Sequence, residues 1–474
     1  MNYPIVRLST IHIVNFKNVI DGNIDLKTRD CMGKANLLGL YGQNGSGKTA
    51  LVDALMLLKL ALCGQTVPNC FSDYINTGES QAVLSFSFEM WSPDSDAITT
   101  VTYTVAIQKK ELDSNTIPGL SASNQLNSTL LCNETLSYSV KTNGNVTVRS
   151  AKLIDTDSVE TPFVSSSERK YHDLVGNSTQ SLASLMAAKK ISETLSKSFV
   201  FSKEFLDIFR ANCRNDSYRL VIESLVLYGN RDLFVFDTPS NAIISFNILP
   251  ISFNYAETPS NGFYGNLAIP FAGNGLIPVD ALSLVEKIIE NLNIVLNALI
   301  PGLTVSCEKM GIELLPNGDK AQRIQLLSNK NDKAIPFCYE SEGIKKIVAI
   351  LQLLIMAYNN PSATVVIDEL DSGVFEYLLG EILRIISTSG KGQLIFTSHN
   401  LRPLETIDKS FIAFTTTNPQ KRYIRIVNVK TTNNLRNFYY RDITLGEQAE
   451  PVYESTNNHD IAIAFKKAGE CCGT

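Results

Sequence analysis

Residues 37–58, "LLGLYGQNGSGKTALVDALMLL", decide the fold because they join an apolar run, a glycine-rich turn and an amphipathic run. The residues before the turn predict a buried strand, and the residues after it predict a helix. The turn matches GxxxxGK[ST], with Gly42, Gly47, Lys48 and Thr49 at the fixed positions. Strand, turn and helix together indicate a phosphate-binding loop of the Walker A type. A purely structural glycine turn is the disfavoured alternative, because both flanks agree.

The spacing of this loop has a physical reason. Glycines let successive N–H groups point inward around a polyphosphate, and the helix start adds unpaired amides and the positive end of the helix dipole. We expect Lys48 to reach the β- and γ-phosphates of ATP, and the Thr49 hydroxyl to coordinate Mg²⁺. The predicted nucleotide contacts of the loop are Gly42, Asn44, Gly45, Ser46, Gly47, Lys48 and Thr49.

Length and composition set limits on the class of protein. The 474 residues, 44% of them hydrophobic, suffice for two or three domains. A net charge of −5 argues against an extensively basic surface, but a local patch leaves nucleic acid open as a partner. Nine cysteines without CxxC or Cys/His ligand spacing, and no secretory leader, predict a reduced cytoplasmic protein without disulfides or zinc. The longest apolar run, residues 347–358, is too short to span a membrane, so no membrane partner is expected.

A second motif of the site is "TVVIDEL", residues 364–370. This β-branched run ends in two carboxylates, which in an α/β sheet emerge at the carboxyl edge where ligands bind. The pattern is that of a Walker B strand. Asp368 is expected to hold Mg²⁺, and Glu369 to polarise the attacking water. The alternative, a strand that ends in a solvated acidic turn, loses weight because a Walker A loop is also present.

A third motif is "LIFTSHN", residues 394–400, another apolar strand that ends in a histidine. One strand–helix–strand unit fits between Asp368 and His399, so both side chains should emerge at the same sheet edge. An imidazole at this place can hydrogen-bond the γ-phosphate and report its presence. A structural histidine is the alternative, and the position at the end of a strand favours the functional interpretation.

The chain between the motifs predicts four parts. The expected ranges are an N-terminal ATPase part (1–125), an insertion that is mixed and then helical (126–299), a C-terminal ATPase part (300–430) and a tail (431–474). The insertion shows no sustained heptads, so a long coiled-coil arm is not expected. Its helical part is the most basic region, where a solvated helix face is preferred over a contact with nucleic acid or an acidic partner. The basic residues are Lys189, Lys190, Lys197, Lys203, Arg210, Arg214 and Arg219.

The motifs, taken in order, resemble the ABC-type ATPase heads of the SMC, RecF and OLD-like group. The resemblance implies an α/β fold, with a mixed sheet, an antiparallel N-terminal β part and a mostly helical insertion. It covers the two ends of the chain and not the insertion. The segments that carry it are "IHIVNFKNV" (11–19), "GQNGSGKT" (42–49), "SEG" (341–343), "VVIDELDSG" (365–373) and "FTSHN" (396–400).

In that group two heads enclose two nucleotides, which implies a homodimer or a higher homo-oligomer. By resemblance, Ser341 and Gly343 of one subunit complete the γ-phosphate site of the other, and Asp371 matches the loop that links the two sites. Phe16 and Lys17 lie where the group contacts the nucleotide. "SEG" lacks a double glycine and resembles the shorter form of OLD-like ATPases. The glutamine of the Q-loop has no clear counterpart, with Gln81 a weak candidate.

The resemblance implies an ATPase that uses ATP and Mg²⁺, and most closely suggests one that controls a separate effector in bacterial abortive-infection (anti-phage) systems. That effector is a nuclease or toxin, and a TOPRIM nuclease is one form of it. We expect it to be a separate protein, because the chain after His399 is too short for a TOPRIM fold. A DNA-repair or chromosome-organising clamp is the alternative, disfavoured by the missing coiled coil. A transporter motor subunit fits less well because of the large insertion. An AAA-plus or helicase head fits least, given the distance from Lys48 to Asp368.

Overall fold

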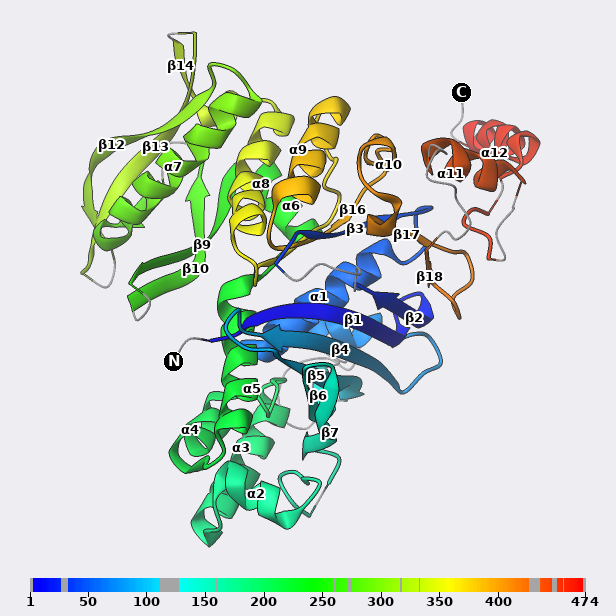
Figure 1. Cartoon of the computed structure of the whole chain (residues 1–474). Coiled ribbons are helices and arrows are strands. Elements are labelled where there is room, and N and C mark those ends of the chain that lie inside the picture. The colour runs from blue at the N-terminus through cyan, green and yellow to red at the C-terminus, as the bar shows by residue number, and fades with distance from the viewer. Residues whose placement is uncertain are drawn as a thin grey trace.

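The computed structural model (Figure 1) shows a parallel sheet at the centre of the molecule. Its strand order is β18-β17-β3-β16-β15-β8, and all neighbours except β18 run parallel. The central strands are apolar and buried throughout, as expected for a sheet that is covered on both faces. The strands are β3 (Asn36–Tyr41), β8 (Leu233–Phe236), β15 (Thr364–Ile367), β16 (Gln393–Thr397), β17 (Ile412–Thr415) and β18 (Tyr423–Ile424). The structure describes residues 3–26, 33–110, 128–158, 160–258, 261–271, 275–315, 318–331, 333–425, 435–445, 450–454 and 456–471.

An antiparallel sheet lies against the first one, with the strand order β2-β1-β4-β5-β6-β7. Buried and half-buried residues alternate along β4, so one face of this sheet packs on the core. β4 and β5 pair antiparallel, with Gln81 opposite Gln108 and Trp91 opposite Ile98. The strands are β1 (Ile5–Phe16), β2 (Val19–Asp25), β4 (Gln81–Trp91), β5 (Ala97–Lys110), β6 (Ser128–Thr142) and β7 (Asn145–Asp155).

Helix α1 (Lys48–Leu62) is enclosed between the two sheets (Figure 1). Its leucines share one core cluster with Ile11 of β1 and Phe86 of β4 on one side, and with Val366 of β15 on the other. A helix that is apolar on most of its circumference is stable only when it is buried in this way. The helix that begins at the Walker lysine is therefore fixed from both sides.

Polar side chains join the two sheets directly. The amide of Gln393, at the start of β16, accepts from the Leu8 N–H at 2.9 Å and donates to the Leu8 C=O at 2.8 Å. The Arg7 guanidinium donates to the carbonyls of Pro361 and Lys391. A buried backbone N–H and C=O must find partners, and here one side-chain amide supplies both. These bonds connect the antiparallel sheet to the edge of the parallel sheet opposite the ligand edge.

The other face of the parallel sheet is covered by helices α8 and α9, which form a second core cluster with α7 and strands β11, β12 and β13. A short hairpin, β9 and β10, lies beside them. The helices are α6 (Thr238–Ser245), α7 (Val279–Leu299), α8 (Glu342–Asn359) and α9 (Glu376–Ser389). The strands are β9 (Ile248–Thr258), β10 (Asn261–Pro270), β11 (Gly275–Pro278), β12 (Thr304–Leu314), β13 (Lys320–Lys330) and β14 (Lys333–Pro336).

The range 126–299 divides between different layers. β6 and β7 extend the antiparallel sheet, four helices pack beside them, and β8 returns to the parallel sheet. The four helices are α2 (Glu168–Val175), α3 (Thr179–Thr194), α4 (Lys203–Asn212) and α5 (Asp216–Leu227). Helix α10 (Pro403–Thr406) lies between β16 and β17, and α11 (Leu435–Leu445) and α12 (Asn458–Cys471) follow β18. Within the described ranges, no helix combines the length and apolarity needed to cross a membrane.

Candidate active site

The glycine loop between β3 and α1 adopts the backbone that its sequence predicts. Gly47 has φ of 97°, a left-handed conformation that favours glycine, and caps the N-terminus of α1. A Cβ on Gly42 would lie 1.8 Å from Oγ1 of Thr415, so no larger residue fits there. The Lys48 ammonium donates to the carbonyls of Gly42 at 2.8 Å and Gln43 at 3.0 Å. The first turn of α1 carries no acidic residue, which leaves its positive end available to an anion.

The Walker A and Walker B residues meet in space. Burial lowers the pKa of Lys48, and the charges of Asp368, Asp371 and Glu369 oppose that shift. Three carboxylates that act on one buried ammonium must lie near it, because Coulomb interactions weaken with distance. The structure therefore brings the predicted lysine and the predicted acidic residues to the same sheet edge.

Asp368 is held rigidly and Glu369 is presented to solvent. Asp368 is 1% exposed, and its carboxylate accepts from Thr397 Oγ1 at 2.6 Å and from Thr238 Oγ1 at 2.9 Å. Glu369 is exposed and has φ of 50°, and its N–H donates to the same Thr397 hydroxyl at 2.8 Å. A non-glycine residue in the left-handed region costs free energy and is found preferentially at functional sites. One threonine thus orients both acidic residues of the Walker B turn.

The residues present suit Mg²⁺. Thr49 offers a hydroxyl and Asp368 a carboxylate, and magnesium prefers such hard oxygen ligands. In the described part of the chain, no group of three His, Cys, Asp or Glu residues forms a metal site of its own. Phosphate oxygens would complete the coordination, as is usual for a nucleotide-borne magnesium ion.

His399 lies at the edge predicted for it. β15 and β16 pair in parallel, with Ile367 opposite Phe396, so Asp368 and His399 follow their strands on the same side. The N–H groups of His399 and Asn400 donate to Oδ2 of Asp371 at 3.0 and 2.9 Å. The imidazole is exposed and free to face a phosphate, while the Asp371 carboxylate ties the two motifs together.

The "SEG" segment opens helix α8, as predicted. Ser341 is the N-cap, and its hydroxyl accepts from the Ile344 N–H at 3.3 Å. Gly343 lies against the backbone of Gly373, where a Cβ would come within 2.2 Å of the carbonyl oxygen. Only glycine allows this approach, so the segment and the loop after Asp371 move as one unit.

Three other expected residues lie differently. The Phe16 ring is fully buried and makes an edge contact with Tyr74, with ring centroids 5.8 Å apart, so the ring has no surface to offer a nucleotide. The Lys17 ammonium pairs with Asp53 and lies 4.0 Å from the Tyr74 ring centroid. Gln81 begins β4, where its side chain accepts from Gln108 at 3.1 Å. The structure does not bring Gln81 to the phosphate loop.

The end of β8 contributes residues that the sequence analysis missed. Phe236 of β8 is opposite Ile367, so the residues after both strands reach the same edge. Besides the Thr238 contact, the Asn241 side chain donates to the Asp368 carbonyl at 3.1 Å. The apolar run "LFVF" followed by Asp-Thr is a strand-end signal, but it lies within the range assigned to the insertion. A strand this short is difficult to recognise in a sequence whose neighbouring segments predict long helices.

Lys346 was also missed. It is 4% exposed, donates to Asn241 Oδ1, and lies 4.7 Å from the Phe236 ring centroid. Burial lowers its pKa to about 8, against the opposing charges of Glu369, Asp368 and Asp371. Lys346 is on the helix that Ser341 caps, so the ammonium and Asn241 connect this helix to the Walker B turn.

The C-terminal part of the chain reaches the phosphate loop as well. The N–H of Glu454 donates to the Gln43 side chain at 2.9 Å, and the N–H of Thr417 donates to the Pro451 carbonyl at 2.8 Å. The Tyr423 hydroxyl donates to the Gly47 carbonyl at 2.9 Å. The loop is therefore supported by chain segments that no sequence motif marks.

A protein-family model and a curated relative each match part of the chain. The protein-family model described as "AAA domain" matches residues 10–217, less than half of the chain, including the phosphate loop. The DNA replication and repair protein RecF of Deinococcus radiodurans is 35% identical over 77 residues, which are 16% of this chain and 19% of that protein. The chain thus matches only about a fifth of the length of that curated relative.

Similar solved structures include SMC heads and RecF. An SMC head bound to the C-terminal winged-helix domain of ScpA has 13% identity and a TM-score of 0.39, covering 88% of this chain and 98% of that one. The SMC head of Thermotoga maritima has 13% identity and a TM-score of 0.34, covering 89% and 100%. RecF with ATP has 12% identity and a TM-score of 0.33, covering 84% and 94%. TM-scores this low carry no argument about function.

The fold is that of an ABC-type ATPase head. The parallel sheet with its phosphate loop, the antiparallel sheet built from the N-terminal strands, and the helical layer that begins at Ser341 confirm the predicted fold class.

Proposed function

We propose that this protein is an ATPase whose two copies close around ATP and Mg²⁺ and separate after hydrolysis. The meeting of Lys48 with Asp368 and Glu369 supports binding and hydrolysis. In this mechanism Lys48 neutralises the β- and γ-phosphates, Thr49 and Asp368 hold Mg²⁺, Glu369 activates water, and His399 contacts the γ-phosphate. The glycine loop supplies backbone N–H groups.

The observation that carries dimerisation is an exposed aromatic pair beside the Ser341 helix. Tyr339 is 77% exposed and Phe375 is 70% exposed, and in the sequence they lie close to Gly343 and Gly373, whose backbones are in contact. Large aromatics are enriched in the buried cores of protein interfaces. We infer that a second copy covers this face and brings its phosphate loop opposite Ser341, the arrangement that the family resemblance implies.

The first test separates ATP binding from hydrolysis. Glu369→Gln keeps the shape of the side chain but removes the base, so it should bind ATP and accumulate as a dimer. Lys48→Ala removes the charge that faces the phosphates, so it should neither bind ATP nor dimerise with it. Sedimentation with and without ATP measures the mass, and a steady-state assay measures turnover. Normal turnover by Glu369→Gln would exclude Glu369 as the base.

The second test addresses the shared site. A mixture of Lys48→Ala and Ser341→Arg subunits forms heterodimers with one intact site, built from the wild-type loop of one subunit and the wild-type serine of the other. Each variant alone should be inactive. If the two sites act independently, each heterodimer should keep about half of the wild-type turnover, so an equimolar mixture with random pairing should recover about a quarter. Heterodimers without any recovery would rule out a site shared between subunits.

For the biological role, we propose DNA repair or chromosome organisation, because the similarity to RecF supports it. DNA should then bind the closed dimer and stimulate hydrolysis, with an affinity that falls steeply as salt rises. The measurement is ATP turnover with and without double-stranded DNA at several salt concentrations. Identical turnover, together with no DNA retained by Glu369→Gln in ATP, would refute this role.

Control of a separate nuclease or toxin in anti-phage defence is the second candidate. Helix α12 favours it, because Ile461, Ile463 and Phe465 are exposed there and offer an apolar surface for a partner. This role predicts that Phe465→Asp loses a co-expressed effector encoded beside the gene while its ATP turnover is unchanged. Retention of that effector by the variant would remove α12 as its docking site.

A further inference from the structure

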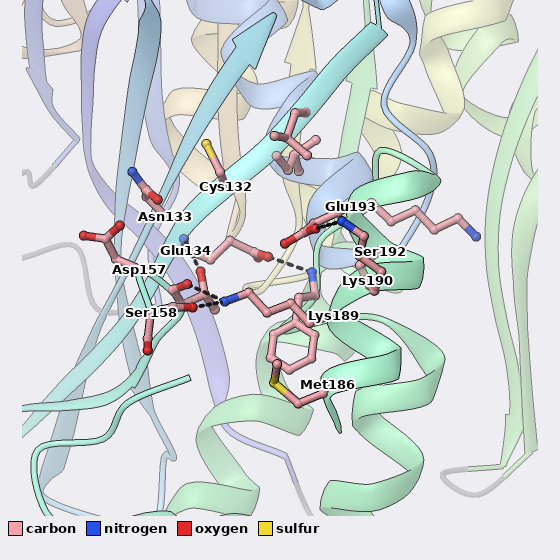
Figure 2. A pocket seen from close by; sticks show the side chains of 15 residues that line it. Cys132, Asn133, Glu134, Asp157, Ser158, Met186, Lys189, Lys190, Ser192 and Glu193 are labelled. Carbon is pink, nitrogen blue, oxygen red and sulfur yellow. Dashed lines mark hydrogen bonds and ion pairs between the residues drawn. The ribbon is translucent and has the colours of Figure 1, made fainter. Parts of the chain in front are cut away.

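A cavity of about 490 Å³ lies apart from the phosphate loop, between β6, residues 156–158 and helix α3 (Figure 2). None of its lining residues belongs to the parallel sheet or to α1. Its volume falls within the range of small-molecule sites, which are mostly apolar with a few placed polar groups. The function proposed above does not use this cavity.

The cavity is built on a rigid polar floor. Glu134 of β6 is fully buried, and its carboxylate accepts from Tyr103 at 2.7 Å, from Ser198 at 2.5 Å and from the Phe199 N–H at 2.6 Å. A carboxylate enclosed by three donors has no need of a ligand cation. Its role is to fix β6 to the segment after α3, which gives the cavity a preformed shape.

One wall of the cavity is apolar. It contains Leu130, Leu131, Met186 and Phe199. Burial raises the pKa of the neighbouring Cys132 to about 12, so this thiol is neutral and adds to the same wall. Such a wall favours the hydrocarbon part of a ligand, since burying apolar surface is favourable.

Lys189 lies on α3, three residues after Met186, and also lines the cavity. Its ammonium donates to the carbonyls of Thr156 at 2.8 Å and Ser158 at 2.6 Å, which occupy two of its three donors (Figure 2). Burial lowers the pKa of Lys189, and nearby Glu193, Asp157, Glu134 and Asp155 oppose that shift. The remaining donor is available to an anion that enters the cavity.

The lining holds three lysines and three acidic residues, so its net charge is about zero, and the placement of the charges decides where an anion binds. Glu193 is occupied by Lys190, at 3.2 Å, and Asp157 lies at the exposed rim. Lys197 adds a second cation to the lining. The Ser192 hydroxyl, in a residue only 2% exposed, has no hydrogen-bond partner among the residues that the structure describes. A buried polar group without a partner calls for an explanation, and a ligand that donates or accepts there supplies one.

From these contacts we propose that the cavity binds a small organic anion with an apolar body. The anionic group lies at Lys189 and Lys197, and the body lies against Met186 and Phe199. The site is independent of nucleotide binding at Lys48. Its occupant is a free small molecule, so binding needs neither DNA nor a partner protein.

The test uses two dyes that differ in charge. 1-Anilinonaphthalene-8-sulfonate carries the aromatic rings and an anion, and N-phenyl-1-naphthylamine carries the rings alone. Fluorescence titration of the wild-type protein should show saturable binding of the anionic dye. Lys189→Met should weaken it by about ten- to a hundredfold, the effect of one charge-assisted hydrogen bond, and should leave the neutral dye unchanged.

Matched controls make the outcome decisive. Lys203→Met on α4 removes the same charge from an exposed position outside the cavity, so it should bind both dyes like the wild type. Met186→Trp narrows the cavity from its rim, without altering the Lys189 contacts, and should weaken both dyes. Unfolding curves identify variants that are not folded. Equal loss in Lys189→Met and Lys203→Met, or an anionic dye unaffected by both Lys189→Met and Met186→Trp, would overturn the proposal.

Discussion

Thr397→Val tests how the Walker B turn is held. The Thr397 hydroxyl donates to the Asp368 carboxylate at 2.6 Å and accepts from the Glu369 N–H at 2.8 Å. Valine has nearly the same shape, so the substitution removes both bonds without leaving a cavity. Thr397 is buried, and water cannot easily replace the lost hydroxyl. Both acidic residues of the site therefore lose a hydrogen bond in one change, while Asp368 keeps the bond from Thr238.

The magnitude follows from the two bonds. A hydrogen bond to a charged group contributes about 1.5–3 kcal/mol, and a neutral one about 0.5–1.5 kcal/mol. We expect the free energy of unfolding to fall by about 2–4 kcal/mol. If only about 1.4 kcal/mol of this affects the transition state of hydrolysis, kcat falls about tenfold. ATP binding should change little, because the Lys48 loop is untouched.

Three measurements check this prediction, namely urea unfolding, binding of a fluorescent ATP analogue and steady-state hydrolysis. Thr397→Ser is the control, since it keeps the hydroxyl and should retain most of the wild-type kcat. Equal hydrolysis by Thr397→Val and Thr397→Ser would refute the role given to the hydroxyl. A valine variant that loses ATP binding as severely as kcat would show that the damage is general.

Two further predictions concern the helix that Ser341 caps. Gly343→Ala places a Cβ within 2.2 Å of the Gly373 carbonyl oxygen. The free energy of unfolding, measured in urea, should therefore fall by about 1–3 kcal/mol. The control is Gly469→Ala on α12, where the Cβ enters open space and the free energy of unfolding should not fall. In the protein without ATP or Mg²⁺, the pKa of Lys346 is lowered from 10.5 to about 8, so the unfolded state binds more protons between these pH values. Across this window the free energy of unfolding of the wild type should therefore rise with pH, relative to that of Lys346→Met, by up to about 1.4 kcal/mol per pH unit. Thermal unfolding of both proteins at several pH values measures this difference. Parallel pH profiles would contradict a buried charge at Lys346.

The sequence predicts those parts of the site that local patterns encode. The loop before Lys48 and the strand before Asp368 each follow from a run of a few residues, and the structure places both as expected. Fold class follows as well, because the motifs in their order resemble ABC-type ATPase heads, and that resemblance implies an α/β fold with a mixed sheet and an antiparallel N-terminal part. The trans arrangement of Ser341 across a dimer stays a prediction.

The remainder depends on pairing between distant segments. β8 is four residues long and is recognised only by its register with β15, so Thr238 and Asn241 were not predicted. Burial of the Phe16 ring depends on packing with Tyr74, which a strand pattern does not specify. The tail contact at Gln43 is a backbone bond, and a backbone bond leaves no mark on residue type.

The position of β3 has a consequence for how the chain is made. β3 ends at Tyr41, yet both of its neighbours, β16 and β17, begin only at Gln393 and Ile412. At the usual rate of synthesis, the strand emerges from the ribosome roughly 20 to 70 s before β16 exists. During this time an apolar strand exposes unpaired edges, which are prone to aggregate. Nascent chains would therefore depend on chaperones. A stalled ribosome would leave a fragment that contains the whole phosphate loop, but in which β3 lacks its partner strands β16 and β17.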